Sequence, residues 1–73
     1  MWFWVVEVEM PNGTVGYIAS QYCFARCKDA RKHFDNEREN LELYMESQEV
    51  IEALDVSFVW VPCDERWKPY RWN

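Results

Sequence analysis

The first ten residues alternate between two faces in the pattern of a β-strand. One face is wholly apolar and comprises Trp2, Trp4, Val6, Val8 and Met10. The other face starts apolar and turns acidic at Glu7 and Glu9. This alternation predicts a strand over residues 2–10. Trp4 is expected in the core, because it shares the apolar face with Val6 and Val8.

A turn signal follows the strand directly. Proline in Pro11-Asn12-Gly13-Thr14 presets φ for the first turn position, and Asn-Gly tolerates the positive φ of tight hairpin turns. Residues 14–19 then predict the returning strand of a β-hairpin.

Residues 21–34 have the spacing of a helix. Four side chains recur at intervals of three or four residues, namely Phe24, Cys27, Arg31 and Phe34. Ser20 is the candidate N-cap of this helix. Asn36 followed by Glu39 resembles a capping box, which predicts that a second helical segment starts here.

Residues 37–54 allow two interpretations. The segment is rich in helix-forming residues, and one stripe at helical spacing comprises Leu41, Tyr44, Met45, Gln48 and Ile51. Alternatively, Leu41, Leu43 and Met45 alternate as in a half-buried strand, and Ser47 caps a separate helix over 48–54. We favour one helix, because no β-branched residue precedes Val50 in this segment.

Residues 56–63 predict the last strand. Its two faces are largely apolar, with Val56, Phe58 and Trp60 on one and Ser57, Val59 and Val61 on the other. We therefore expect this strand to be well covered. Pro62 ends it or lies at an edge of the sheet.

The elements together predict one α+β domain over residues 1–73, in the order strand, strand, helix, helix, strand. The simplest packing is a three-stranded sheet with the helical segment on one face. The first and last strands are the most apolar, so we place them side by side, with the strand at 14–19 on an edge. Their relative direction stays open. Residues 64–73 form a polar-aromatic C-terminal tail.

Charge and size limit the class of partner. The chain has 73 residues and a net charge of −5. Nucleic acids and anionic membranes select basic surfaces, so we expect direct binding to neither. The acidic balance favours a basic protein partner, or serves solubility alone.

The apolar run at residues 2–6 is too short for a signal peptide core or a membrane span, and three cysteines is an odd number. We expect a cytoplasmic protein with reduced thiols.

Motifs for catalysis or metal binding are sparse. The chain has one histidine and two glycines, without a phosphate-binding loop or a nucleophile motif beside a base. Cys23 and Cys27 share a helical face at i and i+4, and His33 and Cys63 would be needed to complete four ligands. His33 lies about 120° from that face on an ideal helix. We therefore expect no enzymatic activity, no metal and no cofactor.

The distribution of charge is the most informative feature of the sequence. Residues 35–55 contain eight carboxylates and one basic residue, a net charge of −7, whereas residues 26–33 carry +3. On one helix, four glutamates at spacings of three and four form a single stripe, namely Glu39, Glu42, Glu46 and Glu49. Unpaired like charges at this spacing destabilise a helix by roughly a few tenths of a kcal/mol each. The stripe is therefore a candidate contact surface for a basic partner; the alternative is an ordinary solvated face.

The tail is a second candidate contact surface. It interleaves basic residues with large rings, of which Trp67, Tyr70 and Trp72 are the candidate contacts. Tryptophan, tyrosine and arginine are enriched among the residues that dominate protein interfaces. The alternative is that these rings fold back and extend a small core.

The layout resembles small phage-encoded proteins that disable host machinery, among them inhibitors of bacterial RNA polymerase and anti-CRISPR proteins. The similarity lies in the aromatic strand at residues 3–9, the Asn12-Gly13 turn and the strand at residues 57–61. It covers most of the chain at the level of architecture, without a family-specific motif, so no functional residue is carried over. The resemblance implies function by steric or electrostatic blocking, often of a nucleic-acid-binding surface, in the manner of a DNA mimic.

These observations favour a small acidic protein that blocks a basic surface of a bacterial host protein or ribonucleoprotein complex, in the host cytoplasm. The alternative is a structural or assembly module that homodimerises through its aromatic surface or an edge strand. Salt should weaken binding by the acidic inhibitor and leave the aromatic dimer intact.

Overall fold

The computed structural model describes residues 1–62, which form three strands and two helices. The elements in chain order are β1 (Trp2–Glu9), β2 (Val15–Ala19), α1 (Cys27–Asn36), α2 (Arg38–Ser47) and β3 (Glu52–Trp60). The predicted α+β class and the predicted order of elements are confirmed.

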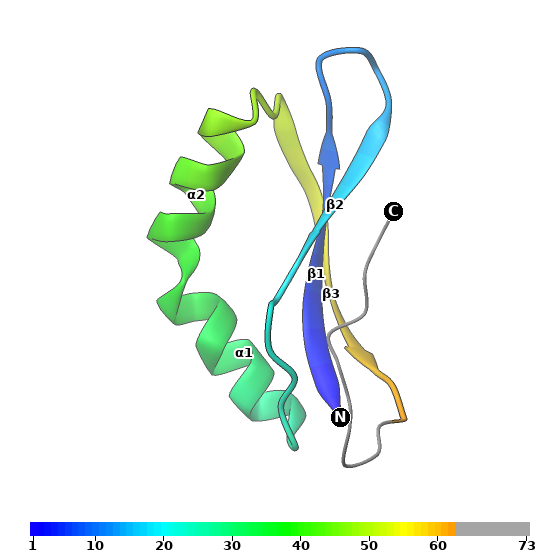
Figure 1. Cartoon of the computed structure of the whole chain (residues 1–73), viewed down its shortest axis with the longest axis vertical. Coiled ribbons are helices and arrows are strands. Elements are labelled where there is room, and N and C mark those ends of the chain that lie inside the picture. The colour runs from blue at the N-terminus through cyan, green and yellow to red at the C-terminus, as the bar shows by residue number, and fades with distance from the viewer. Residues whose placement is uncertain (63–73) are drawn as a thin grey trace.

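The strands form one antiparallel sheet in the order β2-β1-β3 (Figure 1). Val6 in the central strand faces Ile18 on one side and Val56 on the other. The expected adjacency of the first and last strands is therefore confirmed, and their direction is antiparallel. The register shifts between Glu7 and Val8, so that Leu54 is an extra residue in β3 and forms a β-bulge.

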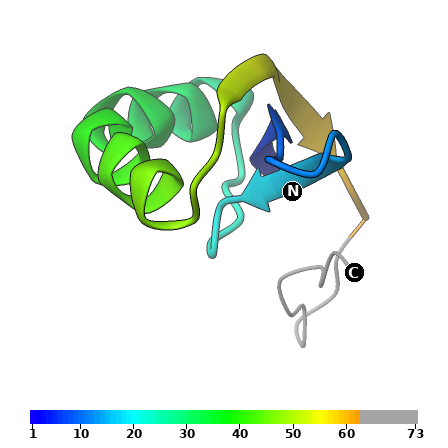
Figure 2. The same ribbon diagram turned by 90° about the horizontal axis from the view of Figure 1, so that it is seen from above.

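Both helices lie against the same face of the sheet (Figure 2). The buried core between the helices and the sheet consists of Trp4, Val6 and Val8 from β1 with Leu41 from α2. Six half-buried apolar side chains surround this core, namely Met10, Ile18, Phe34, Met45, Val50 and Phe58. Trp4 is only 4% exposed, so the predicted apolar face of the first strand is the core face.

The predicted hairpin turn is present. Gly13 has φ of 81°, which a glycine adopts without steric cost, and its N–H donates to the Met10 carbonyl at 2.9 Å. The Asn12 side-chain oxygen accepts hydrogen bonds from the Thr14 N–H at 3.1 Å and from the Thr14 hydroxyl at 2.6 Å. The returning strand begins at Val15 rather than at Thr14.

Ser20 does not cap a helix, and the expected helix over 21–34 begins only at Cys27. The Ser20 hydroxyl instead accepts the Trp4 N–H at 3.3 Å and donates to the Tyr22 carbonyl at 2.8 Å. The chain then continues alongside β1, where Trp2 and Phe24 form an antiparallel bridge. Pairing with β1 thus holds residues 20–24 in an extended connection in place of the first helical turn.

The two helices meet at Glu37. The Glu37 N–H donates to the His33 and Phe34 carbonyls at the end of α1, and the Glu37 carbonyl accepts the Leu41 N–H at the start of α2. The interruption near residue 36 is confirmed, but the predicted capping box is not, because the N-cap of α2 is Glu37 without a side-chain capping bond.

β3 differs most from the sequence-based expectation. It begins at Glu52, so residues 52–54 belong to a strand and not to the expected helix, and it ends at Trp60. The Ile51 N–H already donates to the Glu9 carbonyl at 2.9 Å, which shows that pairing with β1 overrides helix propensity here. Most β3 side chains are exposed, so the expectation of a well-covered strand was wrong: β3 is an edge strand.

Candidate functional site

The candidate surface is built on α2, which is a helix as the sequence favoured and not the alternative strand. Leu41 is its buried residue and Met45 is half-buried, four residues further along the same face. These two side chains attach the helix to the core. The rest of α2 is exposed, and Figure 1 shows α1 and α2 together as an arc beside the sheet.

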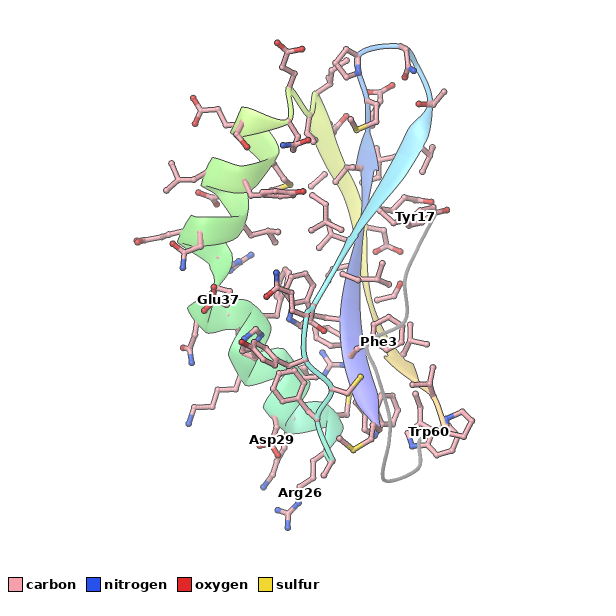
Figure 3. All side chains as sticks on the ribbon, in the orientation of Figure 1. Phe3, Tyr17, Arg26, Asp29, Glu37 and Trp60 are labelled. Atoms are coloured by element: carbon pink, nitrogen blue, oxygen red, sulfur yellow. The ribbon has the colours of Figure 1, made fainter. Side chains whose placement is uncertain are left out.

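Three of the four predicted glutamates lie on α2. Glu39, Glu42 and Glu46 are all exposed, and their spacing of three and four residues places them on one stripe. Within residues 1–62, none of these three carboxylates forms an ion pair. By contrast, Glu37, which Figure 3 labels at the helix junction, accepts a hydrogen bond from the Asn40 amide at 3.1 Å. As far as residues 1–62 show, the stripe is therefore a row of carboxylates without ion-pair partners.

Glu49, the fourth glutamate, lies outside the helix, since α2 ends at Ser47 and not near residue 54. The Val50 N–H donates to the Met45 carbonyl at 2.9 Å and the Glu49 N–H to the Glu46 carbonyl at 3.1 Å. This pair of bonds is a Schellman motif, which places its C′ residue in the left-handed conformation. Glu49 occupies that position with φ of 59°. Its carboxylate therefore extends the acidic surface beyond the helix end, and its backbone is strained.

A groove of about 370 Å³ lies between α2 and β3. Its apolar lining comprises Val6, Phe34, Leu41, Met45, Ala53, Leu54 and Val56. Three charged residues complete it, namely Arg38, Glu42 and Asp55. Leu54 is 46% and Val56 37% exposed, so apolar surface remains open to solvent in the groove.

Sequence reasoning missed this groove because it expected β3 to be covered on both faces. Glu52 and Asp55 were the available signal, because charged residues on a strand are typical of the edge of a sheet.

A second groove, of about 650 Å³, opens between β2 and the helices. Its polar lining includes His33, Glu37, Asn40 and Tyr44. Nδ1 of His33 accepts the indole N–H of Trp4 at 3.1 Å, and the His33 ring lies 5.0 Å from the Phe24 ring and 5.9 Å from the Tyr22 ring. These contacts give His33 a packing role that joins α1 to the sheet.

From the sequence we weighed Cys23, Cys27, His33 and Cys63 as metal ligands and expected no metal. In the described part of the chain, no group of three His, Cys, Asp or Glu residues is placed to hold a metal ion. Cys23 precedes α1 and Cys27 begins it, and both are half-buried and not joined by a disulfide. Cys63 and the predicted tail contacts Trp67, Tyr70 and Trp72 lie outside the described residues.

Within residues 1–62, neither helix has the length and apolar character needed to cross a membrane.

Comparison of the chain with protein-family models, with curated proteins and with solved structures finds no match.

Proposed function

We propose that this protein is a small acidic binding protein that docks on a basic surface of another protein and blocks it. The observation that carries the proposal is the exposed row of Glu39, Glu42 and Glu46, none of which has an ion-pair partner within residues 1–62. Repulsion along this row destabilises the free helix by roughly a few tenths of a kcal/mol per pair. Lysine or arginine side chains of a partner would remove that repulsion on docking.

The strained conformation of Glu49 supports the same proposal. A left-handed conformation costs a residue with a Cβ about 1–2 kcal/mol, and glycine escapes that cost. In the free protein, the strained backbone of Glu49 therefore lies next to a row of carboxylates that repel one another, and both features lower the stability. Sites where a sequence departs from its locally stable choice are candidates for functional selection.

The partner class follows from the shape and charge of the surface. Glu39 and Glu46 are seven residues apart, which corresponds to about 10 Å along a helix, enough to meet several basic side chains on one face of a partner. Basic surfaces of this kind occur on proteins that handle nucleic acids. A bacterial host protein or ribonucleoprotein complex of that class is the partner that the resemblance to phage proteins implies.

The test is a matched pair of charge reversals. A partner is first captured from bacterial lysate and identified by mass spectrometry, and its affinity for the purified protein is then measured. Glu39→Lys combined with Glu46→Lys should weaken binding at least about tenfold, because buried charge pairs at interfaces commonly contribute more than 1.4 kcal/mol. Circular dichroism and the urea midpoint should show that the fold survives.

The control reverses two exposed carboxylates of α1, Asp29→Lys with Asp35→Lys, and changes the net charge equally. This variant should keep its affinity. An equal loss of affinity in both variants would show that only net charge matters. Unchanged affinity in the α2 variant would show that the glutamate row is an ordinary solvated face and not a contact surface.

A second candidate function is assembly into a homodimer, which the exposure of β3 favours. Trp60 at the end of this edge strand is 57% exposed (Figure 3). Sedimentation equilibrium over a range of concentrations separates the two functions. A dimer that persists at high salt and is lost in Trp60→Ala would favour assembly over docking on a basic partner.

A further inference from the structure

We infer that the groove between α2 and β3 binds an extended basic segment of the partner protein, which pairs with the outer edge of β3. This inference rests on the proposed function and specifies the partner segment and its mode of binding. Three features carry it: an apolar groove that is open to solvent, an edge of β3 with which no strand of residues 1–62 pairs, and acidic residues near both.

The groove has the character of a binding site because α2 only partly covers the sheet. Leu41 is the buried side chain of α2, and the helix leaves a hollow of about 370 Å³ beside β3. Leu54 and Val56 of β3 face this hollow and stay 46% and 37% exposed. Alternate apolar side chains of a strand laid along β3 would fill it, as happens where a peptide binds between an edge strand and a helix.

The backbone of β3 can accept such a strand. Trp2 and Trp4 direct their backbone groups toward the β2 side, since they bond to Phe24 and Ser20 there. Phe58 lies opposite Trp4 in the register, so its N–H and C=O point away from β1. Val56 and Trp60 have the same orientation by the alternation along the strand. The outer edge thus offers backbone donors and acceptors at every second residue.

Asp55 covers part of this edge in the free protein. Its Oδ1 accepts the outward N–H of Val56 at 2.9 Å. Charged side chains placed in this way protect natural edge strands from unwanted pairing. A lysine or arginine on an incoming strand would pair with the Asp55 carboxylate and release the Val56 N–H for the new strand. The edge would then open selectively to a basic segment.

Charge decides between a basic segment and a second copy of this chain. Glu42 and Asp55 line the groove together with Arg38. Around it, the stretch 38–55 contains six carboxylates and a single basic residue, Arg38. β3 itself contains Glu52 and Asp55 and no basic residue. Pairing of two β3 strands would bring four carboxylates onto one ribbon, whereas a basic strand would neutralise them.

The experiment uses a synthetic, end-capped peptide of alternating lysine and valine as the probe. Nitrogen-15 NMR of the intact protein should show saturable shifts at the amides of residues 54–60 and of α2. Affinity should fall at least tenfold between low and high salt. A peptide of alternating glutamate and valine should not bind. Shifts confined to β2, or equal binding of the acidic peptide, would overturn the inference.

Two proline variants test the strand pairing. Val56→Pro removes an N–H that points away from β1, so the sheet keeps its internal bonds while the probe loses one, and affinity should fall about tenfold. Val15→Pro is the control on the opposite edge, where the N–H also points outward, and it should keep full affinity. Equal affinity of Val56→Pro and the unmodified protein would overturn the inference. If Val56→Pro does not fold, the NMR shifts of the unmodified protein still decide.

Two further outcomes separate the groove from the proposed function. Loss of the captured partner in Glu39→Lys/Glu46→Lys, but not in Val56→Pro, would overturn the groove and leave the function standing. Loss of partner binding in Val56→Pro alone would support the groove as the binding site and contradict the role of the glutamate row on α2. NMR shifts at β3 that depend on protein concentration in the absence of peptide would show that a second copy of the chain pairs with this edge. That result would overturn the inference of a basic partner segment.

Discussion

The indole N–H of Trp4 in β1 donates a hydrogen bond of 3.1 Å to Nδ1 of His33 in α1. The two rings are also stacked, with centroids 6.2 Å apart and planes inclined by 27°. Since Nδ1 accepts, the neutral His33 ring carries its proton on Nε2. The core tryptophan thus has its polar atom satisfied by the helix that covers it, and the bond fixes the position of α1 on the sheet.

Removing this hydrogen bond should destabilise the fold measurably. Trp4→Phe keeps most of the ring and leaves His33 Nδ1 without its donor, so we expect a loss of about 1–2 kcal/mol in the free energy of unfolding. His33→Ala and the double variant complete a double-mutant cycle in urea. The coupling should be about 1 kcal/mol, and a coupling near zero would mean that the two residues act independently.

The tryptophans of β1 and β3 should differ strongly in their contribution to stability. Trp4 is 4% exposed and belongs to the core cluster, so Trp4→Ala should cost about 3–5 kcal/mol, comparable to most of the stability of a domain this small. Trp60 is 57% exposed, and Trp60→Ala should cost about 0.5 kcal/mol. Urea midpoints check both, and similar midpoints for the two variants would contradict the assignment of the core.

Relief of backbone strain at Glu49 should stabilise the protein. Glu49→Gly keeps the Schellman motif and removes the Cβ from a residue with φ of 59°, so we expect a gain of about 1 kcal/mol in thermal or urea unfolding. Glu49→Ala removes the charge and retains the strain. It should therefore gain much less, and an equal gain in both variants would attribute the effect to charge alone.

Stability should not depend on a metal ion. Residues 1–62 bring together no group of three candidate ligands, and Cys27 is a half-buried thiol at the first turn of α1. EDTA should therefore leave the melting temperature unchanged, as should added zinc. A drop of several degrees with EDTA would reveal a structural metal site, because the binding energy of such a metal contributes directly to folding.

The predicted part of the site is the part that depends on spacing along one helix. Glu39, Glu42 and Glu46 follow intervals of three and four, so any helix through them places them on one stripe. Glu49 was predicted on the same stripe but lies beyond the end of α2, because that end depends on Val50 packing against the core beside Met45. The groove was not predictable either, since it depends on how far α2 lies from β3.

The sequence by itself determined the elements whose signals are local. Period-two alternation sets β1 and its core face, and Asn12-Gly13 sets the turn, because side-chain direction and φ preference act within a few residues. Only the tertiary structure decided that Ser20 does not cap a helix and that residues 52–54 belong to a strand. Both segments have helix signals, yet their backbone or hydroxyl groups bond to β1, which is 16 residues away in the chain for Ser20 and much farther for residues 52–54. Pairing with a central strand satisfies these groups and outweighs the small differences in local propensity.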